Sequence, residues 1–172
     1  NASPEVVPDL LLVASVAEGD LRSSLIAIGE ASLQRLRWAW KPERTSISAE
    51  AKKVILEGLS KEGATERLLC VGAAGLFGVG AAREALEEIL CGTGEAPLRR
   101  RAAWALGRLG DPACLPRLQG LLRSETEGAV REGVALALAR FRRPEALTVL
   151  VEALRRRDYA SALNLRAAIR EI

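Results

Sequence analysis

The stretch LRRRAAWALGRLGDPACLPRLQGLL, from Leu98 to Leu122, decides the fold of this 172-residue chain. Moved by 32 residues in either direction, it aligns with residues 130–154 and with residues 66–90. The three copies stay in one register without a gap, which predicts an array of repeated structural units. The aligned positions include Leu118 with Leu86 and Leu150, Leu122 with Leu90 and Leu154, Gly110 with Gly78, and Pro112 with Pro144.

Each copy is expected to form two helices joined by a tight turn. Small and apolar residues recur at three- and four-residue spacing in the first half, which is typical of a helix packed closely on its neighbours. Gly110 ends that helix because glycine tolerates the left-handed conformation. Asp111 then caps the second helix, and Pro112 suits its first turn. The second helix presents one apolar face, which consists of Leu115, Leu118, Leu121 and Leu122. A single hairpin of this size cannot close a core, but stacked copies can.

The rest of the chain continues the plan less regularly. We expect helices over residues 5–17, 21–37, 48–60, 64–77, 81–91, 97–109, 112–123, 129–141, 144–156 and 160–171. Arg37 to Ser46 is a longer connection, and Ser46 or Ser48 is expected to cap the helix beyond it. Residues 1–3 are interpreted as a tag or linker remnant. Residues 4–172 are expected to form one domain, with irregular repeats over 4–62, regular repeats over 64–157 and a capping helix over 158–172.

Composition excludes several kinds of chemistry. The chain has no histidine, which removes His-based triads, histidine metal ligands and the usual general base at neutral pH. Its three cysteines, Cys70, Cys91 and Cys114, have no CxxC spacing and are interpreted as core residues in a reducing, cytoplasmic compartment. We therefore expect no catalytic residue, no metal and no cofactor. The longest uncharged stretch, residues 68–82, is too short and too rich in glycine for a membrane helix.

A glycine-rich string over residues 71–86, VGAAGLFGVGAAREAL, suggests a nucleotide-binding loop at first sight. Arg83 stands where the dinucleotide fingerprint requires a small residue, and Gly80 is followed by two alanines instead of Lys and Ser or Thr. The 32-residue repeat explains Gly75 and Gly78 as partners of Gly107 and Gly110. The string is therefore interpreted as part of the repeat.

The segment Ala102–Leu122 resembles the HEAT-like repeat of the phycobilisome-lyase type, and the resemblance extends over about residues 64–157. It implies an all-α fold, a right-handed α-α superhelix of about five helical hairpins. In that family an Arg early in the first helix and an Asp in the turn recur and join the units. The Arg recurs here as Arg67, Arg99 and Arg131, whereas the Asp is present only as Asp111. The resemblance also implies that the second helices line a concave groove.

Charge is unevenly distributed along the chain. Residues 97–172 contain 15 Arg, no Lys and 8 Asp or Glu, whereas residues 1–96 carry a net negative charge. Along the expected groove, the positions outside the leucine face change from acidic to basic. A dipolar groove suits a protein surface or an extended peptide better than a uniform polyanion. The candidate partner-binding residues are Glu84, Glu87, Glu88, Gln119, Arg123, Glu152, Arg155 and Arg156.

These observations predict a non-catalytic scaffold module that binds a protein or peptide, within a larger bacterial-type protein. Two alternatives stay open. The arginine-rich half suggests binding of nucleic acid, and the family resemblance suggests a role like that of bilin lyases. Trp38 and Trp40 are interpreted as covering one end of the core, with an exposed recognition site as the alternative. Trp104 is expected to pack within the strongest repeat.

Overall fold

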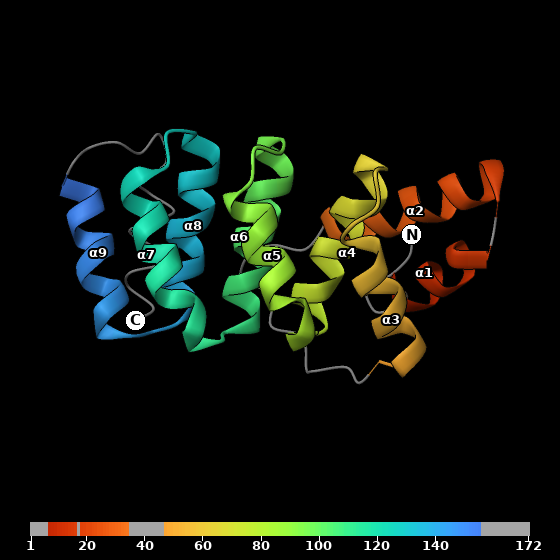
Figure 1. Ribbon diagram of the computed structural model, residues 1–172, viewed down its shortest axis with the longest axis horizontal. Helices are drawn as coiled ribbons and strands as arrows, with labels where there is room; N and C mark the ends of the chain where they lie inside the picture. Colours follow the sequence, from red (N-terminus) through yellow and green to blue (C-terminus); the bar gives the residue numbers. More distant parts are fainter. Residues whose placement is uncertain (1–6, 17, 35–46, 156–172) are drawn as a thin grey trace. The chain divides into compact units, whose positions relative to one another are not determined.

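The computed structural model describes residues 7–16, 18–34 and 47–155, and every regular element within these ranges is helical (Figure 1). The Cα packing divides the chain after Ala82 into two compact units. Unit 1 contains α1 (Val7–Val16), α2 (Gly19–Gln34), α3 (Ala49–Gly58), α4 (Ala64–Leu76) and the 3-10 turn η2 (Gly80–Ala82). Unit 2 contains α5 (Arg83–Cys91), α6 (Ala96–Leu109), η3 (Pro112–Cys114), α7 (Leu115–Ser124), α8 (Gly128–Arg140) and α9 (Pro144–Arg155).

Unit 1 is built around the packing of α4 against α2 and α3, with α1 against α2 and α3. Leu11, Ile55 and Leu69 are among its fully buried side chains. The N-terminus of α3 is capped as the sequence predicts, because the Ser48 hydroxyl accepts a hydrogen bond from the Ala51 N–H at 3.1 Å. Burial of leucine and isoleucine therefore holds this unit together, and a local polar cap defines where α3 begins.

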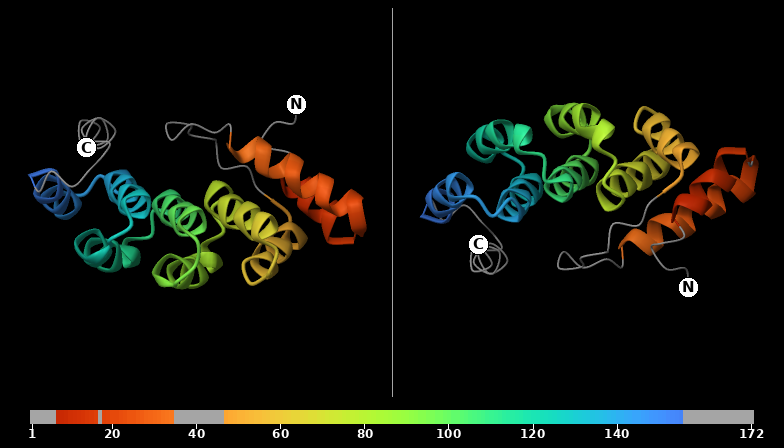
Figure 2. Two further views of the ribbon diagram at one scale, coloured as in Figure 1. Left: turned by 90° about the horizontal axis from the view of Figure 1, so that it is seen from above. Right: turned by 90° about the horizontal axis from the view of Figure 1, so that it is seen from below.

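In unit 2 the helices form two layers, with α6 beside α8 in one layer and α5 beside α7 in the other (Figure 2). The last helix, α9, packs on both α7 and α8. The two layers meet across a core of leucines, and α6 approaches α8 closely because alanine and glycine lie at their contact. Among the described residues of this unit, the fully buried leucines are Leu86, Leu90, Leu106, Leu118, Leu138 and Leu150.

The turn between α6 and α7 has the geometry that its sequence predicts. Gly110 is left-handed, with φ +66°, and its N–H donates to the Leu106 carbonyl at 3.1 Å. Asp111 follows and accepts a hydrogen bond from the Ala113 N–H at 3.0 Å. Gly78, 32 residues earlier, is left-handed as well, with φ +65°. The repeat in the sequence is therefore a repeat in backbone conformation at this turn.

The recurring arginine joins each first helix to the second helix before it. Arg67 on α4 donates through Nε to the Leu59 carbonyl at the end of α3, at 2.7 Å. Arg99 on α6 donates through Nε to the Leu90 carbonyl of α5 at 3.0 Å. Arg131 on α8 donates to the Glu125 carbonyl at the end of α7 at 3.2 Å. The guanidinium groups thus satisfy carbonyls that a helix end leaves without an intrahelical partner.

The predicted helices and the observed helices agree within a few residues over the described ranges, and the all-α fold is confirmed. One difference is that the second helices α5 and α7 each begin with a 3-10 turn, which tightens the chain as it reverses direction. The predicted capping helix over 160–171, the connection with Trp38 and Trp40, and Ser46 lie outside the described residues.

Candidate functional site

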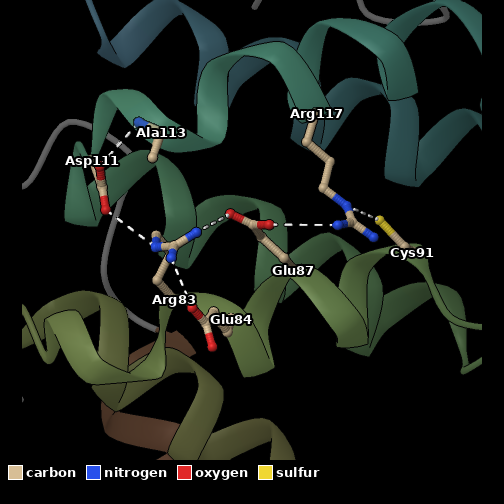
Figure 3. Close-up of polar contacts among 7 residues, drawn as sticks. All are labelled: Arg83, Glu84, Glu87, Cys91, Asp111, Ala113 and Arg117. Atoms are coloured by element: carbon tan, nitrogen blue, oxygen red, sulfur yellow. Dashed lines mark hydrogen bonds and ion pairs between the residues drawn. The ribbon is translucent and has the colours of Figure 1, made fainter.

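Polar side chains connect neighbouring second helices of unit 2 (Figure 3). Arg83 at the start of α5 is the first of these connections. Its guanidinium contacts Asp111 at 3.3 Å, Glu87 at 3.2 Å and Glu84 at 2.9 Å. The hydrogen bond to Glu87 raises the pKa of Arg83 above its ordinary value. We call the whole set the polar seam, and it comprises Arg83, Glu84, Glu87, Cys91, Asp111, Arg117, Gln119, Arg123 and Glu152.

Glu87 is the centre of the polar seam. Its side chain is only 12% exposed, and its two carboxylate oxygens face two arginines from different helices. Arg83 approaches Oε1 from the same helix, and Arg117 of α7 approaches Oε2 at 3.7 Å. Each carboxylate oxygen of this largely buried side chain therefore lies close to a positive charge, which offsets part of the cost of burying the group.

Arg117 reaches a second group on α5 as well. Its Nε lies 3.0 Å from the Sγ atom of Cys91, which is 26 residues away in the chain. The contact joins the C-terminal end of α5 to the first turn of α7. Cys91 is exposed, so the prediction that it is a core residue is wrong. The end of α5 turns this side chain towards the neighbouring helix instead of into the leucine core.

The seam continues from α7 to α9 with weaker contacts. The Gln119 side chain donates to the Glu145 carbonyl at 3.2 Å, and Arg123 lies 3.8 Å from Glu152. Arg123 and Glu152 are each about half exposed, at 52% and 46% of the side chain. An exposed pair at this distance adds little stability, about 0–1 kcal/mol, and its charges remain accessible to a partner.

The structure separates the predicted partner-binding residues into groups. Glu84 and Glu88 are exposed on α5, as a partner-binding role requires. Glu87 is buried, which corrects its assignment as an open contact, because two arginines already occupy its carboxylate. Arg155 ends α9, but its side chain, like the whole of Arg156, lies outside what the structure describes.

Two arginines of the site were absent from the predicted set. The Arg83–Glu87 pair was detectable, because residues four apart lie on the same side of a helix. Arg117 carried no such signal. Its partners, Glu87 and Cys91, belong to another helix, and its position matches none of the charged columns that the 32-residue repeat aligns.

The two other cysteines are buried as predicted, and their thiols are correspondingly weak acids. Burial first, and then the negative charge of Glu66, raise the pKa of Cys70 to about 12. Burial first, and then a hydrogen bond with Glu87, raise the pKa of Cys114 to about 12. Thiol chemistry requires the thiolate, so both residues are expected to be inert in the folded protein.

Treatment of the native protein with iodoacetamide at pH 8 is therefore expected to modify Cys91 alone. With a pKa of about 12, the other two thiols are ionised only to about one part in 10⁴ at that pH, and their burial also blocks access of the reagent. Peptide mass spectrometry after a short reaction measures the three sites separately. The same reaction in 6 M guanidinium is the control and should modify all three. Comparable labelling of Cys70 or Cys114 in the native protein would contradict the structure.

Within the described ranges, no group of three cysteine or acidic residues is placed to hold a metal ion. No helix in that part of the chain has both the length and the apolar character required to cross a membrane.

The comparison with curated proteins found no match. The comparison with protein families did: the model for HEAT repeats matches residues 52–131 and again residues 83–170. These two matches overlap and together cover more than half of the chain. They also include the three recurring arginines and the left-handed turns described above. HEAT repeats generally serve as scaffolds for protein interactions, through the extended surface that stacked hairpins create. The chain belongs to the HEAT repeat family.

Proposed function

We propose that this chain is a non-catalytic interaction module that binds a protein or an extended peptide across the second helices α5 and α7. The observation that carries the proposal is the distribution of charge on the polar seam and beside it. Glu84 and Glu88 are exposed on α5, whereas Arg117 and Arg123 are exposed on α7. A partner that crosses both helices meets negative charge first and positive charge next, which sets its orientation.

Ion pairs beneath this surface join its two helices. Arg83, Glu87 and Arg117 connect α5 with the following turn and helix, so the backbone beneath the exposed charges is held in place. A preorganised surface loses less conformational entropy when it binds. The buried members of the seam therefore support binding indirectly, and the exposed members are proposed to contact the partner.

Nucleic-acid binding has less support from the described residues. Arg83, Arg99, Arg117 and Arg123 all face carboxylates of the protein itself. Affinity for nucleic acid depends on the number of phosphates that free cations neutralise, and these internal pairs reduce that number. A lyase activity of the phycobilisome type rests on the likeness of Ala102–Leu122 to that subfamily, and the histidine-free sequence supplies no ordinary general base for it.

Three further points belong to this proposal. We propose that the two units are parts of one repeat domain, because a HEAT match over residues 52–131 runs across the division after Ala82. We propose that the domain is part of a larger bacterial-type protein. We also propose a cytoplasmic location, which the three free cysteines support.

Selection of peptides by phage display, followed by affinity measurement, tests the proposal. Peptides enriched on the wild-type protein are expected to bind at least tenfold more weakly to the variant Glu88→Lys/Arg123→Glu, because it reverses one exposed charge on each helix. Fluorescence anisotropy with the labelled peptides measures the change, and circular dichroism verifies that helicity is retained.

The matched control is Lys61→Glu/Glu62→Lys in unit 1. Both of these residues are exposed, and the pair of changes likewise leaves the net charge unaltered. The control is expected to bind like the wild type. If the selected peptides bind the Glu88/Arg123 variant as tightly as the wild type, the exposed charges of α5 and α7 do not form the binding surface.

A further inference from the structure

The turn between α8 and α9 departs from the turn between α6 and α7 in a way that local stability does not explain. The two turns are 32 residues apart in the repeat and lie at the same edge of unit 2 (Figure 1). Gly110 and Asp111 in the first turn are replaced by Arg142 and Arg143 in the second. Each replacement opposes what the backbone requires at its position.

Arg142 occupies a conformation that suits glycine. Its φ is +51°, and among the described residues it is the one non-glycine with positive φ. The equivalent Gly110 and Gly78 have nearly the same conformation, with φ +66° and +65°. A side chain in this region brings its Cβ close to the backbone and strains it. Strained residues of this kind concentrate at functional sites.

Arg143 is equally unsuited to its place. Asp111 caps the second helix of its hairpin by accepting a hydrogen bond from the Ala113 N–H. The arginine at the equivalent position has no acceptor on its side chain, and only its backbone carbonyl bonds to α9, accepting from the N–H groups of Ala146 and Leu147. It also places a cation at a helix N-terminus, where the helix dipole is positive and favours anions.

The result of these replacements is a cationic tip at the surface. Arg142 and Arg143 are both exposed, and neither forms an ion pair with any described residue. This one turn combines a non-glycine residue with positive φ, a helix N-cap without a side-chain acceptor and a cation at a helix N-terminus. Such a combination points to selection for something other than stability.

We propose that the α8–α9 turn is a docking point for a short acidic segment of a partner protein, with Arg142 and Arg143 binding its carboxylates. Arginine suits this role because its planar guanidinium group binds a carboxylate through two hydrogen bonds. A long polyanion fits the site less well. A phosphate backbone extended from this turn to the α6–α7 turn at the same edge of unit 2 meets the carboxylate of Asp111 there, whereas a segment of a few residues needs only the α8–α9 turn.

The proposal rests on the proposed function only in that the ligand is a protein. The α8–α9 turn does not belong to the polar seam, so each proposal has its own variant. Loss of binding in Glu88→Lys/Arg123→Glu tests the surface across α5 and α7, and loss of binding in the variant described next tests the turn. Either proposal can therefore fail without the other.

The variant Arg142→Gly/Arg143→Asn gives the turn a left-handed glycine and a good helix cap. The probe is the fluorescein-labelled peptide GSGDEDEGSG, measured by anisotropy at low ionic strength. Wild-type protein is expected to bind it, and the variant is expected to bind at least tenfold more weakly. The variant is also expected to melt about 3–6 °C higher, because the strain is removed and the cap is added.

The control Lys52→Gln/Lys53→Gln also removes two positive charges, but from exposed positions on α3. It is expected to bind the peptide like the wild type. A parallel titration uses a 20-base-pair DNA duplex. The proposal is overturned if wild-type protein does not bind the peptide, if the Gly-Asn variant retains full binding, or if that variant melts lower than the wild type. It is also overturned if the duplex binds more tightly than the peptide and loses that affinity steeply with salt, because the ligand is then a polyanion.

Discussion

Replacing Glu125 by alanine is expected to lower the free energy of unfolding by about 3 kcal/mol. This residue follows α7 directly, and its carboxylate forms an ion pair with Arg99 of α6 and accepts a hydrogen bond from the Glu127 N–H at 2.9 Å. The side chain is 5% exposed and that of Arg99 is 16% exposed. Truncation leaves a largely buried guanidinium group without its counter-charge. The loss falls at the lower end of the range for buried pairs because Arg99 retains its bond to the Leu90 carbonyl.

Urea unfolding followed by circular dichroism at 222 nm measures this change. Glu127→Ala is the matched control, because Glu127 is exposed and its side chain makes no cap hydrogen bond. This substitution is expected to change the free energy of unfolding by less than about 0.5 kcal/mol. Glu125→Gln keeps an acceptor for the Glu127 N–H but removes the charge, so it is expected to fall between the two. If Glu125→Ala is no more destabilising than Glu127→Ala, the ion pair does not hold α6 to the end of α7.

Gly107→Ala is expected to destabilise the protein by about 2 kcal/mol, although alanine is the better helix former. A Cβ at this position would lie 2.7 Å from the Cα atom and 2.9 Å from the Cβ atom of Ala137 on α8. The nearest atom is backbone, so α6 and α8 have to move apart along their close contact. The strain of such overpacking, about 3 kcal/mol at the upper end of the usual range, exceeds the gain in helix propensity of about 1 kcal/mol.

Gly120→Ala on α7 is the control, and its expected effect has the opposite sign. A Cβ there has nothing within 4 Å, so only the propensity term remains and stability rises by about 0.5–1 kcal/mol. Thermal and urea unfolding of the two variants, compared in one buffer, measures both effects. A stabilising Gly107→Ala would mean that α6 and α8 do not approach as closely as described.

The parts of the structure that the sequence predicted well are those that depend on neighbouring residues in the chain. Helix positions followed from the spacing of apolar residues, and the left-handed turn followed from Gly110 and Asp111. Arg67, Arg99 and Arg131 were recognised from their recurrence. Their partners, three backbone carbonyls at the ends of preceding helices, became visible only in the structure.

The candidate site was predicted less completely because side chains cross between helices. The repeat places equivalent residues 32 apart, yet Cys91 with Arg117 and Gln119 with Glu145 are each 26 apart. Long side chains reach along the neighbouring helix, so the residues that touch are not the residues that align. Glu125 shows the same limit, because its pairing with Arg99 has no counterpart in the repeat pattern.

The amino-acid sequence by itself determined the all-helical class, the 32-residue unit and the turn chemistry of this protein, because helix periodicity and capping act over a few neighbouring residues. Tertiary structure alone decided that Glu87 is buried between two arginines while Glu84 and Glu88 remain open to a partner. These three glutamates lie within five residues on one helix and are identical in chemistry. They differ in the direction of their side chains: Glu87 points towards α7, whereas Glu84 and Glu88 point into solvent. Which side of α5 faces α7 depends on how neighbouring hairpins pack.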